Sequence, residues 1–469
     1  MARIDKWDGS LSSFIYRPQA VPKVPPNADT VPLGGVPIAV KDIFDVAGMP
    51  TTGNSRLYAG RQPAATDAAS VAALRRAGAV VLGKLAAWEC GIGGTSFSLP
   101  WPPARNPWSL AHDPGGSSTG SAVAIAAGFC LGSLGSDTGG SIREPASWCG
   151  IAGLKPTYGL LDASGVMKAS YSLDHIGPMA RTAQDCALLL DALLDKTASD
   201  SLSNGINDGI AGLRIGIVDL DSEDLLDLAP DVAKAVDDVA RHFAAAGATL
   251  SRIRLPPLLQ FSAVCTILAS AEGMHLHRDR LEACPTLYDP LTRQRLLAGR
   301  LVTGADYVAA DCLRHQLGEQ VRSAMENVDL LLLPTTRDTA PPLGGFDSHG
   351  GHPSLCRPWN VTGLPALSVR SGFDRNGLPI GLQIVGPAFS EAFVLRVGHA
   401  LESLYDDRSR WPDLSALVPA PSPVAPIAEE APDNLAAVMA SAAEQVRQAV
   451  SAASRPASEF APLRPTSLQ

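Results

Sequence analysis

Residues 112–143 hold two clusters of glycine and serine that are separated by a run of small residues. The first cluster reads GGSSTGS and contains Ser117, and the second reads DTGGSIR and contains Ser141. Glycines beside a serine let the backbone turn sharply and approach a bound group closely, because no Cβ atom stands in the way. Backbone N–H groups in such a turn can point into one small space, which suits an oxyanion. The pattern therefore predicts a site for attack on a carbonyl group.

A serine hydroxyl is a poor nucleophile and needs a base to take its proton. Histidine is the usual base, but His112 and His175 belong neither to a G-x-S-x-G elbow nor to a familiar Ser-His-Asp order. Lys41 is the stronger candidate, since it ends a predicted buried strand at the sheet edge where ligands bind, and Asp42 follows it. Burial would lower its pKa from roughly 10.4 towards 7 or 8. The alternative is an ordinary surface cation at the end of a strand.

Predicted strands alternate with predicted helices over most of the chain. Apolar runs predict strands at 36–40, 79–82, 131–136, 213–218, 329–333, 366–369 and 380–385. Apolar spacing and capping residues predict helices at 66–77, 121–129, 182–194, 231–246 and 390–404, and the segment 259–327 is expected to be mainly helical. Residues 1–33 are expected to be irregular. This alternation indicates an α/β sheet protein.

The composition excludes several classes of protein. The net charge is −9 and no block of Lys and Arg occurs, so we expect no nucleic-acid partner. No apolar run is long enough to span a bilayer, and the N-terminus is too polar for a signal peptide, so a soluble cytoplasmic protein is expected. The eight cysteines form no C-x-x-C pair and the nine histidines form no H-E-x-x-H, so we expect mostly buried thiols, no metal site and no cofactor.

Three stretches together resemble the amidase signature family. They are GGVPIAVKD with Lys41, PGGSSTGSAVAIAAG with Ser117, and GSDTGGSIREPASWCGIAGLKPTYG with Ser141. RNPW, SLDHIGPMART, TGLPALSV and LPIGLQIVGP support them, and the resemblance covers about residues 34–405. Any one glycine-rich string is weak evidence, but all of them in this order are very specific. The sequence is similar to bacterial amidases and to the glutaminase subunit of tRNA-dependent amidotransferases.

The resemblance implies an α/β fold with one large amidase-signature-type domain, in which helices cover both faces of a central mixed sheet. We divide the chain into an N-terminal extension (1–33), the amidase signature domain (34–415) and a Pro/Ala-rich tail (416–469). Within the tail, 434–453 is either a docking helix or a solvated appendage. Only 40 residues precede the lysine, fewer than is common in the family.

The resemblance also implies the roles of three side chains. Ser141 is the nucleophile, Lys41 is the base, and Ser117, which follows a cis peptide bond, carries protons between them. The backbone N–H groups of the oxyanion hole belong to Thr138, Gly139, Gly140 and Ser141.

Further residues have two interpretations each. Gly116 and Arg143 are candidates for substrate binding, although for Arg143 a role in bracing the loop is favoured. Core packing is favoured over a role in the acyl pocket for Trp148, Met167 and Tyr171. The shape of the pocket is expected to depend on loops at 88–110, 160–175 and 255–350.

These observations predict an amidohydrolase that cleaves a carboxamide C–N bond through an acyl-enzyme and releases ammonia or an amine, with esterase or carbamate side activity. We expect a small-molecule amide as its binding partner and no membrane partner. Whether the protein forms a homodimer is left undecided. The alternative is a glutaminase-type subunit of a tRNA-dependent amidotransferase. A nucleotide-binding module is disfavoured because no G-x-x-x-x-G-K-[ST] occurs. A catalytically inactive relative is disfavoured because all three catalytic side chains are present.

Overall fold

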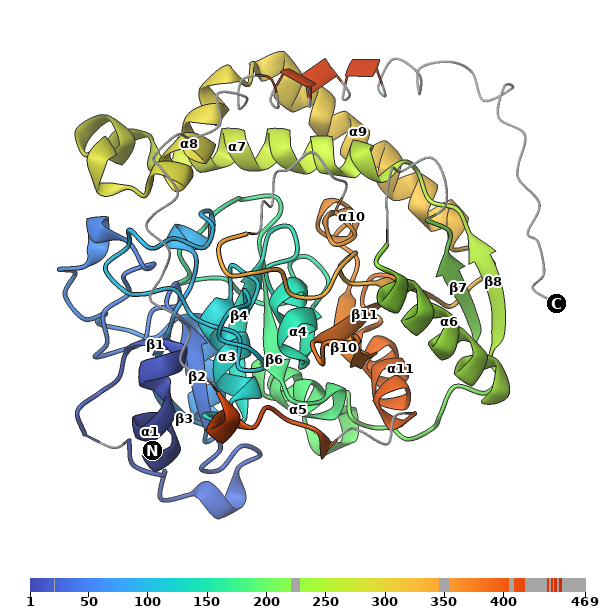
Figure 1. Ribbon diagram of the computed structural model, residues 1–469, viewed down its shortest axis with the longest axis horizontal. Coiled ribbons are helices and arrows are strands. Elements are labelled where there is room, and N and C mark those ends of the chain that lie inside the picture. The colour runs from blue at the N-terminus through green and yellow to red at the C-terminus, as the bar shows by residue number, and fades with distance from the viewer. Residues whose placement is uncertain are drawn as a thin grey trace.

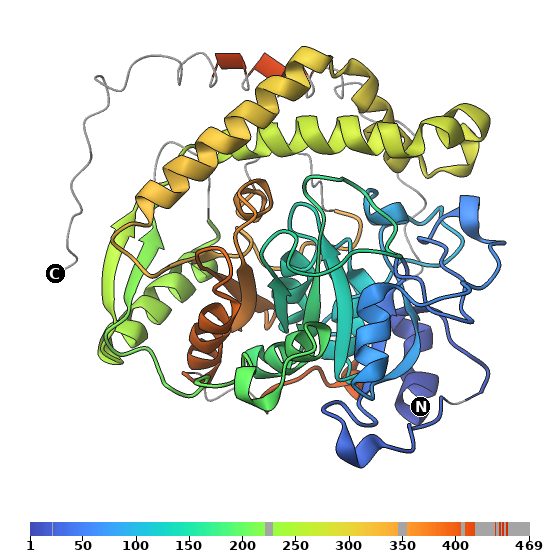
Figure 2. The ribbon, with the colours of Figure 1, turned by 180° about the vertical axis from the view of Figure 1, so that it is seen from behind.

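A computed structural model describes residues 1–20, 22–220, 228–345, 354–404 and 409–417, together with seven positions of the tail. Those positions are 437, 440, 441, 443, 444, 447 and 448. An α/β body forms most of the molecule, and three helices, α7 (Leu258–Ala283), α8 (Pro290–Ala298) and α9 (Gly304–Ala324), lie across one end of it (Figures 1 and 2).

One mixed sheet of eleven strands runs through the described part of the chain, in the order β1-β3-β2-β4-β6-β5-β10-β11-β9-β7-β8. Parallel pairs join β2 to β3 and β4, and β7 to β8 and β9, whereas the remaining neighbours are antiparallel. The strands are β1 (Phe14–Tyr16), β2 (Pro37–Lys41), β3 (Val80–Leu85), β4 (Gly132–Asp137), β5 (Ala152–Lys155), β6 (His175–Ala180), β7 (Arg214–Val218), β8 (Thr249–Ile253), β9 (Leu330–Pro334), β10 (Ala366–Phe373) and β11 (Pro379–Val385).

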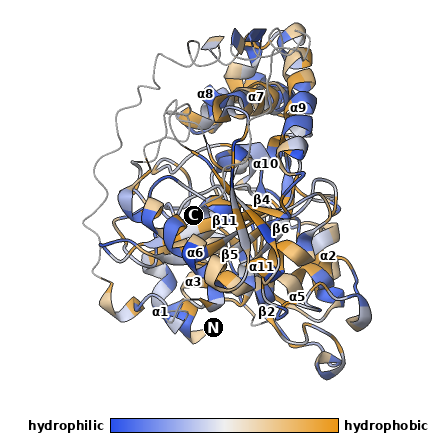
Figure 3. Cartoon of the chain, turned by 90° about the vertical axis from the view of Figure 1, so that its right-hand side faces the viewer, coloured by the Kyte–Doolittle hydropathy of each residue, from blue (hydrophilic) through white to orange (hydrophobic). Residues whose placement is uncertain are grey.

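Helices pack on both faces of this sheet. One face shares a core with α2 (Ala69–Arg76), α5 (Ala183–Leu193), α6 (Pro230–Ala245) and α11 (Glu391–Ser403). The opposite face carries α3 (Thr119–Ala126) and α4 (Arg143–Cys149) over one half, and α7, α9 and α10 (Arg357–Val361) over the other. Figure 3 shows the hydrophobic residues concentrated between these layers. The predicted α/β fold with helices on both faces is confirmed.

Local sequence explains how α3 packs and where α5 and α9 begin. Every residue of α3 is buried, and its small side chains let it pack closely against β2, β3 and β4. α5 begins after Thr182, whose side chain accepts a hydrogen bond from the Asp185 N–H, as the capping pattern predicts. A full capping box between Thr303 and Asp306 starts α9.

The strands and helices predicted between residues 34 and 405 are present, with ends that differ by a few residues. Four strands, β1, β5, β6 and β8, were not predicted. β6 reads HIGPMA, in which glycine and proline hide the apolar run, and β8 is only half-buried. Tertiary pairing with neighbouring strands fixes these segments, and a local pattern does not reveal it.

The prediction that residues 1–33 are irregular is wrong at its start. Residues Ala2–Leu11 form helix α1, which buries Ile4 and Leu11 against the core around α3. The Asp8 carboxylate then accepts hydrogen bonds from the N–H and hydroxyl of Ser13, which turns the chain into β1 beside β3. Two buried residues in ten are too few for a helical pattern to stand out. The three-part division of the chain stays a prediction.

Most of the predicted tail helix at 434–453 lies outside the described residues. Two tail residues that are described contact the α7–α9 layer. Ala443 is buried in its core, and the Arg447 guanidinium lies 2.8 Å from the Asp306 carboxylate at the start of α9.

Candidate active site

The Lys41 side chain projects from the C-terminal end of β2 into the protein and is completely buried. Its Nζ lies 2.7 Å from Ser117 Oγ and 2.8 Å from Ser136 Oγ. Ser136 lies near the end of β4, which pairs directly with β2. Ser136 was missed in the sequence, although its place at the end of a predicted strand beside the lysine strand was a usable signal.

The surroundings of Lys41 favour a neutral amine. Burial lowers the pKa of Lys41 from its usual value near 10.5 to about 7, while the carboxylates of Asp174 and Asp137 act in the opposite direction. Asp174 also accepts a hydrogen bond from Thr138 Oγ1 at 2.7 Å, which connects it to the second glycine-serine cluster. At neutral pH about half of the amine can therefore accept a proton.

The two serine clusters lie next to each other. The peptide bond between Gly116 and Ser117 is cis, as the resemblance implied, and Ser117 is buried. The Ser118 N–H donates to the Ser141 carbonyl oxygen at 3.2 Å, so the backbone itself joins the two loops. A Cβ atom at Gly116 would collide with the Trp88 ring, so only glycine allows this close approach.

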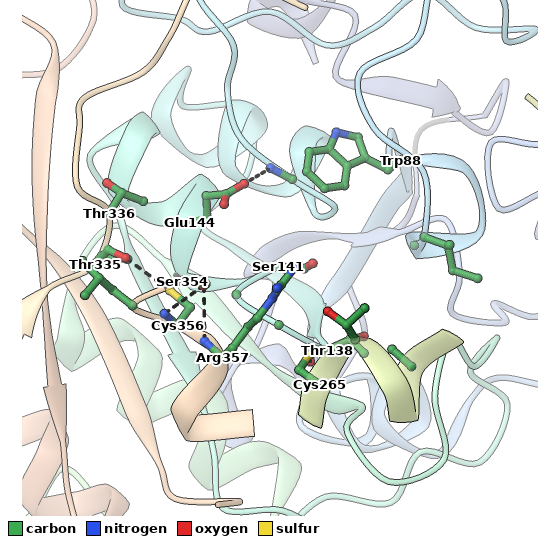
Figure 4. A pocket seen from close by; sticks show the side chains of 18 of the residues that line it. Trp88, Thr138, Ser141, Glu144, Cys265, Thr335, Thr336, Ser354, Cys356 and Arg357 are labelled. Carbon is green, nitrogen blue, oxygen red and sulfur yellow. Dashed lines mark hydrogen bonds between the residues drawn. The ribbon is translucent and has the colours of Figure 1, made fainter. Parts of the chain in front are cut away.

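Ser141 lies on the wall of a cavity of about 570 Å³ (Figure 4). Thr138, Gly139, Gly140 and Gly116 line the same cavity. The prediction for the oxyanion hole needs one correction: the Gly140 N–H donates to the Asp137 carboxylate at 2.7 Å. That N–H is therefore occupied inside the protein and is not available to an oxyanion.

The Asp137 carboxylate and the Arg143 guanidinium brace the loop that carries Ser141. Arg143 is completely buried, and its five N–H groups bond to Asp137 and to the oxygens of Cys356, Gln383 and Asn360. Burial raises the pKa of Asp137, but Arg143 and Asn360 outweigh burial and hold that pKa well below its usual range. Since every donor of Arg143 is used inside the protein, the geometry favours bracing over substrate contact.

The cavity walls come from segments far apart in the sequence. Helix α7 contributes Cys265, Thr266, Ala269 and Ser270, and the segments around Trp88 and 335–345 complete most of the rest. These fall within the expected segments 88–110 and 255–350, and Ala169 contributes from the third expected segment, 160–175. The α7 residues lie on a helix and not on a loop. The residues from 354 to 357, which lead into α10, also line the cavity and were not foreseen.

Trp148, Met167 and Tyr171, which were considered for the acyl pocket, line two different cavities. Trp148 lines the cavity although it is almost fully buried, and its indole N–H donates to the Asp338 carbonyl oxygen. Met167 and Tyr171 line a different, smaller cavity next to Asp174.

The Ser118 hydroxyl forms hydrogen bonds with the backbone of Ser136, so it supports the second hydrogen-bond partner of Lys41.

Glu144 is a cavity residue that sequence reasoning missed. It lies one turn after Ser141, and its Oε1 accepts a hydrogen bond of 3.3 Å from the Gly116 N–H. Burial raises the pKa of Glu144 to about 8. The carboxyl group is thus mainly protonated at neutral pH.

Neither histidine considered as a base is placed for that role. His112 Nδ1 lies 2.8 Å from Ser109 Oγ, and His175 Nδ1 lies 2.7 Å from the Leu173 carbonyl oxygen. Burial also lowers the pKa of His175 well below its usual range. Neither hydrogen bond involves Ser117 or Ser141.

Other site classes find no support in the part of the chain that the structure describes. No group of three His, Cys, Asp or Glu side chains there could hold a metal ion. All eight cysteines are free, and six of them are buried. None of the described helices has the length and apolar character to cross a membrane.

Comparisons with known proteins establish the family of this chain. The family model named Amidase matches residues 19–395. A relative from Roseiflexus sp. (strain RS-1), one of the subunits of its glutamyl-tRNA(Gln) amidotransferase, is 37% identical over 425 residues, which cover 82% of this chain and 86% of that protein. The chain belongs to the amidase family and is an amide-hydrolysing enzyme.

Two solved structures show the same fold. One is the inhibitor-bound vestigial protein complex described for an s-triazine catabolic enzyme, with a TM-score of 0.77 and 32% identity, covering 86% of this chain and 93% of that chain. The other is 6-aminohexanoate cyclic dimer hydrolase with its substrate, with a TM-score of 0.78 and 28% identity, covering 88% of this chain and 94% of that chain.

Proposed function

We propose that this protein hydrolyses a small carboxamide with a Ser141–Ser117–Lys41 triad. The observation that carries the proposal is the buried Lys41 amine, which lies 2.7 Å from Ser117 Oγ beside the loop of Ser141. A buried amine with a lowered pKa is a base at neutral pH, and a hydroxyl between base and nucleophile can pass the proton on. The enzyme is expected to act in the cytoplasm.

The first half of the reaction forms an acyl-enzyme. Ser141 Oγ attacks the amide carbonyl carbon while its proton passes to Ser117 Oγ, and the Ser117 proton passes to Lys41 Nζ. The negative charge moves to the carbonyl oxygen, where N–H groups of the 138–141 loop stabilise it. The Gly140 N–H serves Asp137, so the donors for this charge are those of Thr138, Gly139 and Ser141.

Cleavage of the C–N bond returns the proton through the same groups. Lys41 gives its proton to Ser117, and Ser117 protonates the leaving nitrogen, which departs as ammonia or an amine. Water then attacks the acyl carbon and loses its proton along the same relay, and Ser141 leaves with a proton. The enzyme returns to its starting state with one carboxylic acid and one amine formed.

The test is covalent labelling of the nucleophile. A serine-directed fluorophosphonate should modify Ser141, and mass spectrometry of the digested protein should find the label there. Ser141→Ala should not be labelled. Its kcat on a panel of small amides, esters and carbamates should be lower by at least about 10³-fold. Labelling at another serine, or full activity of Ser141→Ala, contradicts the assignment.

A second function is favoured by the names of the curated relatives, which are subunits of glutamyl-tRNA(Gln) amidotransferases. In that case the chain is a glutaminase subunit that works in a complex. Activity of the purified chain on simple amides, with none on glutamine, would support the stand-alone amidase. Glutamine hydrolysis that requires an added partner would support the second function.

A further inference from the structure

Glu144 places a carboxyl group on the side of the cavity where the leaving amine must lie. In the proposed reaction Ser117 protonates the leaving nitrogen, so that nitrogen lies next to Ser117. Gly116 directly precedes Ser117 and lines the cavity, and the Gly116 N–H is held by Glu144 Oε1. The Glu144 carboxyl is therefore held next to Gly116, and the proposed reaction puts the amine beside the neighbouring Ser117.

The second oxygen of this carboxyl is available to a ligand. Figure 4 shows the Glu144 side chain pointing into the cavity from α4. One of its oxygens, Oε1, accepts the hydrogen bond from the Gly116 N–H. Among the described residues, none donates a hydrogen bond to Oε2. The oxygen that accepts from Gly116 acts as the carbonyl oxygen, so a proton on the group belongs on Oε2.

We propose that Glu144 binds substrate as a neutral carboxylic acid and donates its Oε2 hydrogen to an acceptor, such as a carbonyl oxygen, on the leaving amine. This makes Glu144 a specificity-determining residue for amides whose amine carries such an acceptor one or two carbons from the nitrogen. The proposal rests on the proposed function, because that function places the leaving amine beside Ser117.

Burial and two nearby carboxylates favour the neutral form of Glu144. Burial is the main cause of its raised pKa, and Asp113 and Asp137 act in the same direction. Arg357, at the start of α10, and the Gly116 N–H oppose them. Arg337 and Asp338 line the same cavity. Above about pH 8 the proton is lost, and a carboxylate would then repel the acceptor that the acid had bound.

The test compares two amides that differ in one group. N-acetonylacetamide carries a carbonyl oxygen where N-isobutylacetamide carries a methyl group. The concentration at which each compound protects Ser141 against the fluorophosphonate gives its apparent binding constant, which for a compound that is turned over is its KM. Wild-type enzyme should bind the acetonyl compound about tenfold more tightly at pH 7 and lose that preference by pH 9.

Two variants separate hydrogen bonding from packing. Glu144→Gln keeps the acceptor for Gly116 and puts an N–H at the Oε2 position. It should therefore prefer the acetonyl compound at both pH 7 and pH 9. Glu144→Met should lose the preference at both pH values. Glu319→Gln, the same change at an exposed position on α9, should behave as wild type.

Several results would overturn the inference. These are a preference that survives in Glu144→Met, a preference in Glu144→Gln that fades like that of wild type, or no protection by either compound. Failure of the proposed function looks different, because Ser141→Ala would then still turn over amides and the label would lie elsewhere.

Discussion

Lys41 and Lys84 lie at the ends of two adjacent parallel strands, and neither side chain is exposed to solvent. Lys84 Nζ lies 2.7 Å from the Asp42 carboxylate, whereas the hydrogen bonds of Lys41 Nζ go to two hydroxyls. Burial lowers the pKa of both amines, but for Lys84 the contact with Asp42 directly opposes that effect. Lys84 is thus placed as a structural cation, whereas Lys41 is an amine that can act as a base.

Lys41→Ala should lower kcat by about 10²–10⁴-fold, because general base catalysis contributes that much. Lys41→Arg should be equally inactive, since a guanidinium stays protonated at any working pH. Steady-state kinetics on the best amide of the panel measures both. The circular dichroism spectrum of each variant should match that of wild type.

Lys84→Met is the matched control. It leaves Asp42 buried without its cation, so it should lower the free energy of unfolding by about 3–5 kcal/mol. Enzyme that is still folded should retain most of its kcat. If Lys84→Met inactivates and Lys41→Ala does not, the assignment of the base is wrong.

The pH profile should show a single acid limb. Lys41 acts as the neutral amine, and below its pKa of about 7 the fraction of neutral amine falls tenfold per pH unit. kcat/KM should therefore fall tenfold per pH unit below pH 7 and level off above it for amides without an acceptor on the amine. A profile that stays flat between about pH 5 and 7 would contradict a lysine base.

Asp174→Asn should move this limb to lower pH. The Asp174 carboxylate raises the pKa of Lys41, and its removal leaves burial less opposed. The asparagine oxygen can still accept from the Ala169 and Ser170 N–H groups, and its NH2 group then faces Thr138 Oγ1, whose hydroxyl can turn to accept, which limits the structural change. Asp162→Asn, on an exposed turn nearby, should leave the limb in place.

Part of the site could be predicted because it is written in local sequence. The apolar run before Lys41 marks a buried strand, and the glycines around Ser117 and Ser141 mark two tight turns. The α3 helix between them is identifiable from its small residues. Each of these signals lies within about ten residues of the side chain that it positions.

The rest depends on contacts between distant segments. Lys84 ends a strand just as Lys41 does, and only its contact with Asp42 distinguishes it. The role of Glu144 depends on the Gly116 amide, 28 residues away. Cavity walls from α7 and from residues 354–357 come together only when the sheet has formed, and no local pattern records that.

Arg143→Met should destabilise the fold by about 3–5 kcal/mol, because it leaves the buried Asp137 carboxylate without its cation. Chemical denaturation measures this loss. The pKa of Asp137 is lowered in the folded state, so its contribution is present above about pH 4 and is lost as pH falls. The difference between wild type and variant should therefore shrink in acid. Arg375→Met removes an exposed partner of Asp231 and should cost less than about 1 kcal/mol.

Two glycine-to-alanine changes should have opposite effects on stability. Gly120 lies in the first turn of α3, and a Cβ atom there would lie 2.5 Å from the Ala86 nitrogen and collide with the Ser13 carbonyl oxygen. Both neighbours are backbone, so α3 must shift, and Gly120→Ala should cost at least about 1–3 kcal/mol.

Gly318 lies inside α9 with open space around its Cβ position. Gly318→Ala should therefore stabilise the protein by about 0.5–1 kcal/mol through helix propensity alone. Thermal or urea denaturation of both variants measures the two signs. Because α3 directly follows Ser117, Gly120→Ala should also lower the rate of fluorophosphonate labelling, while Gly318→Ala should leave it unchanged. Equal stability of the two variants would show that α3 does not pack closely against residues 13 and 86.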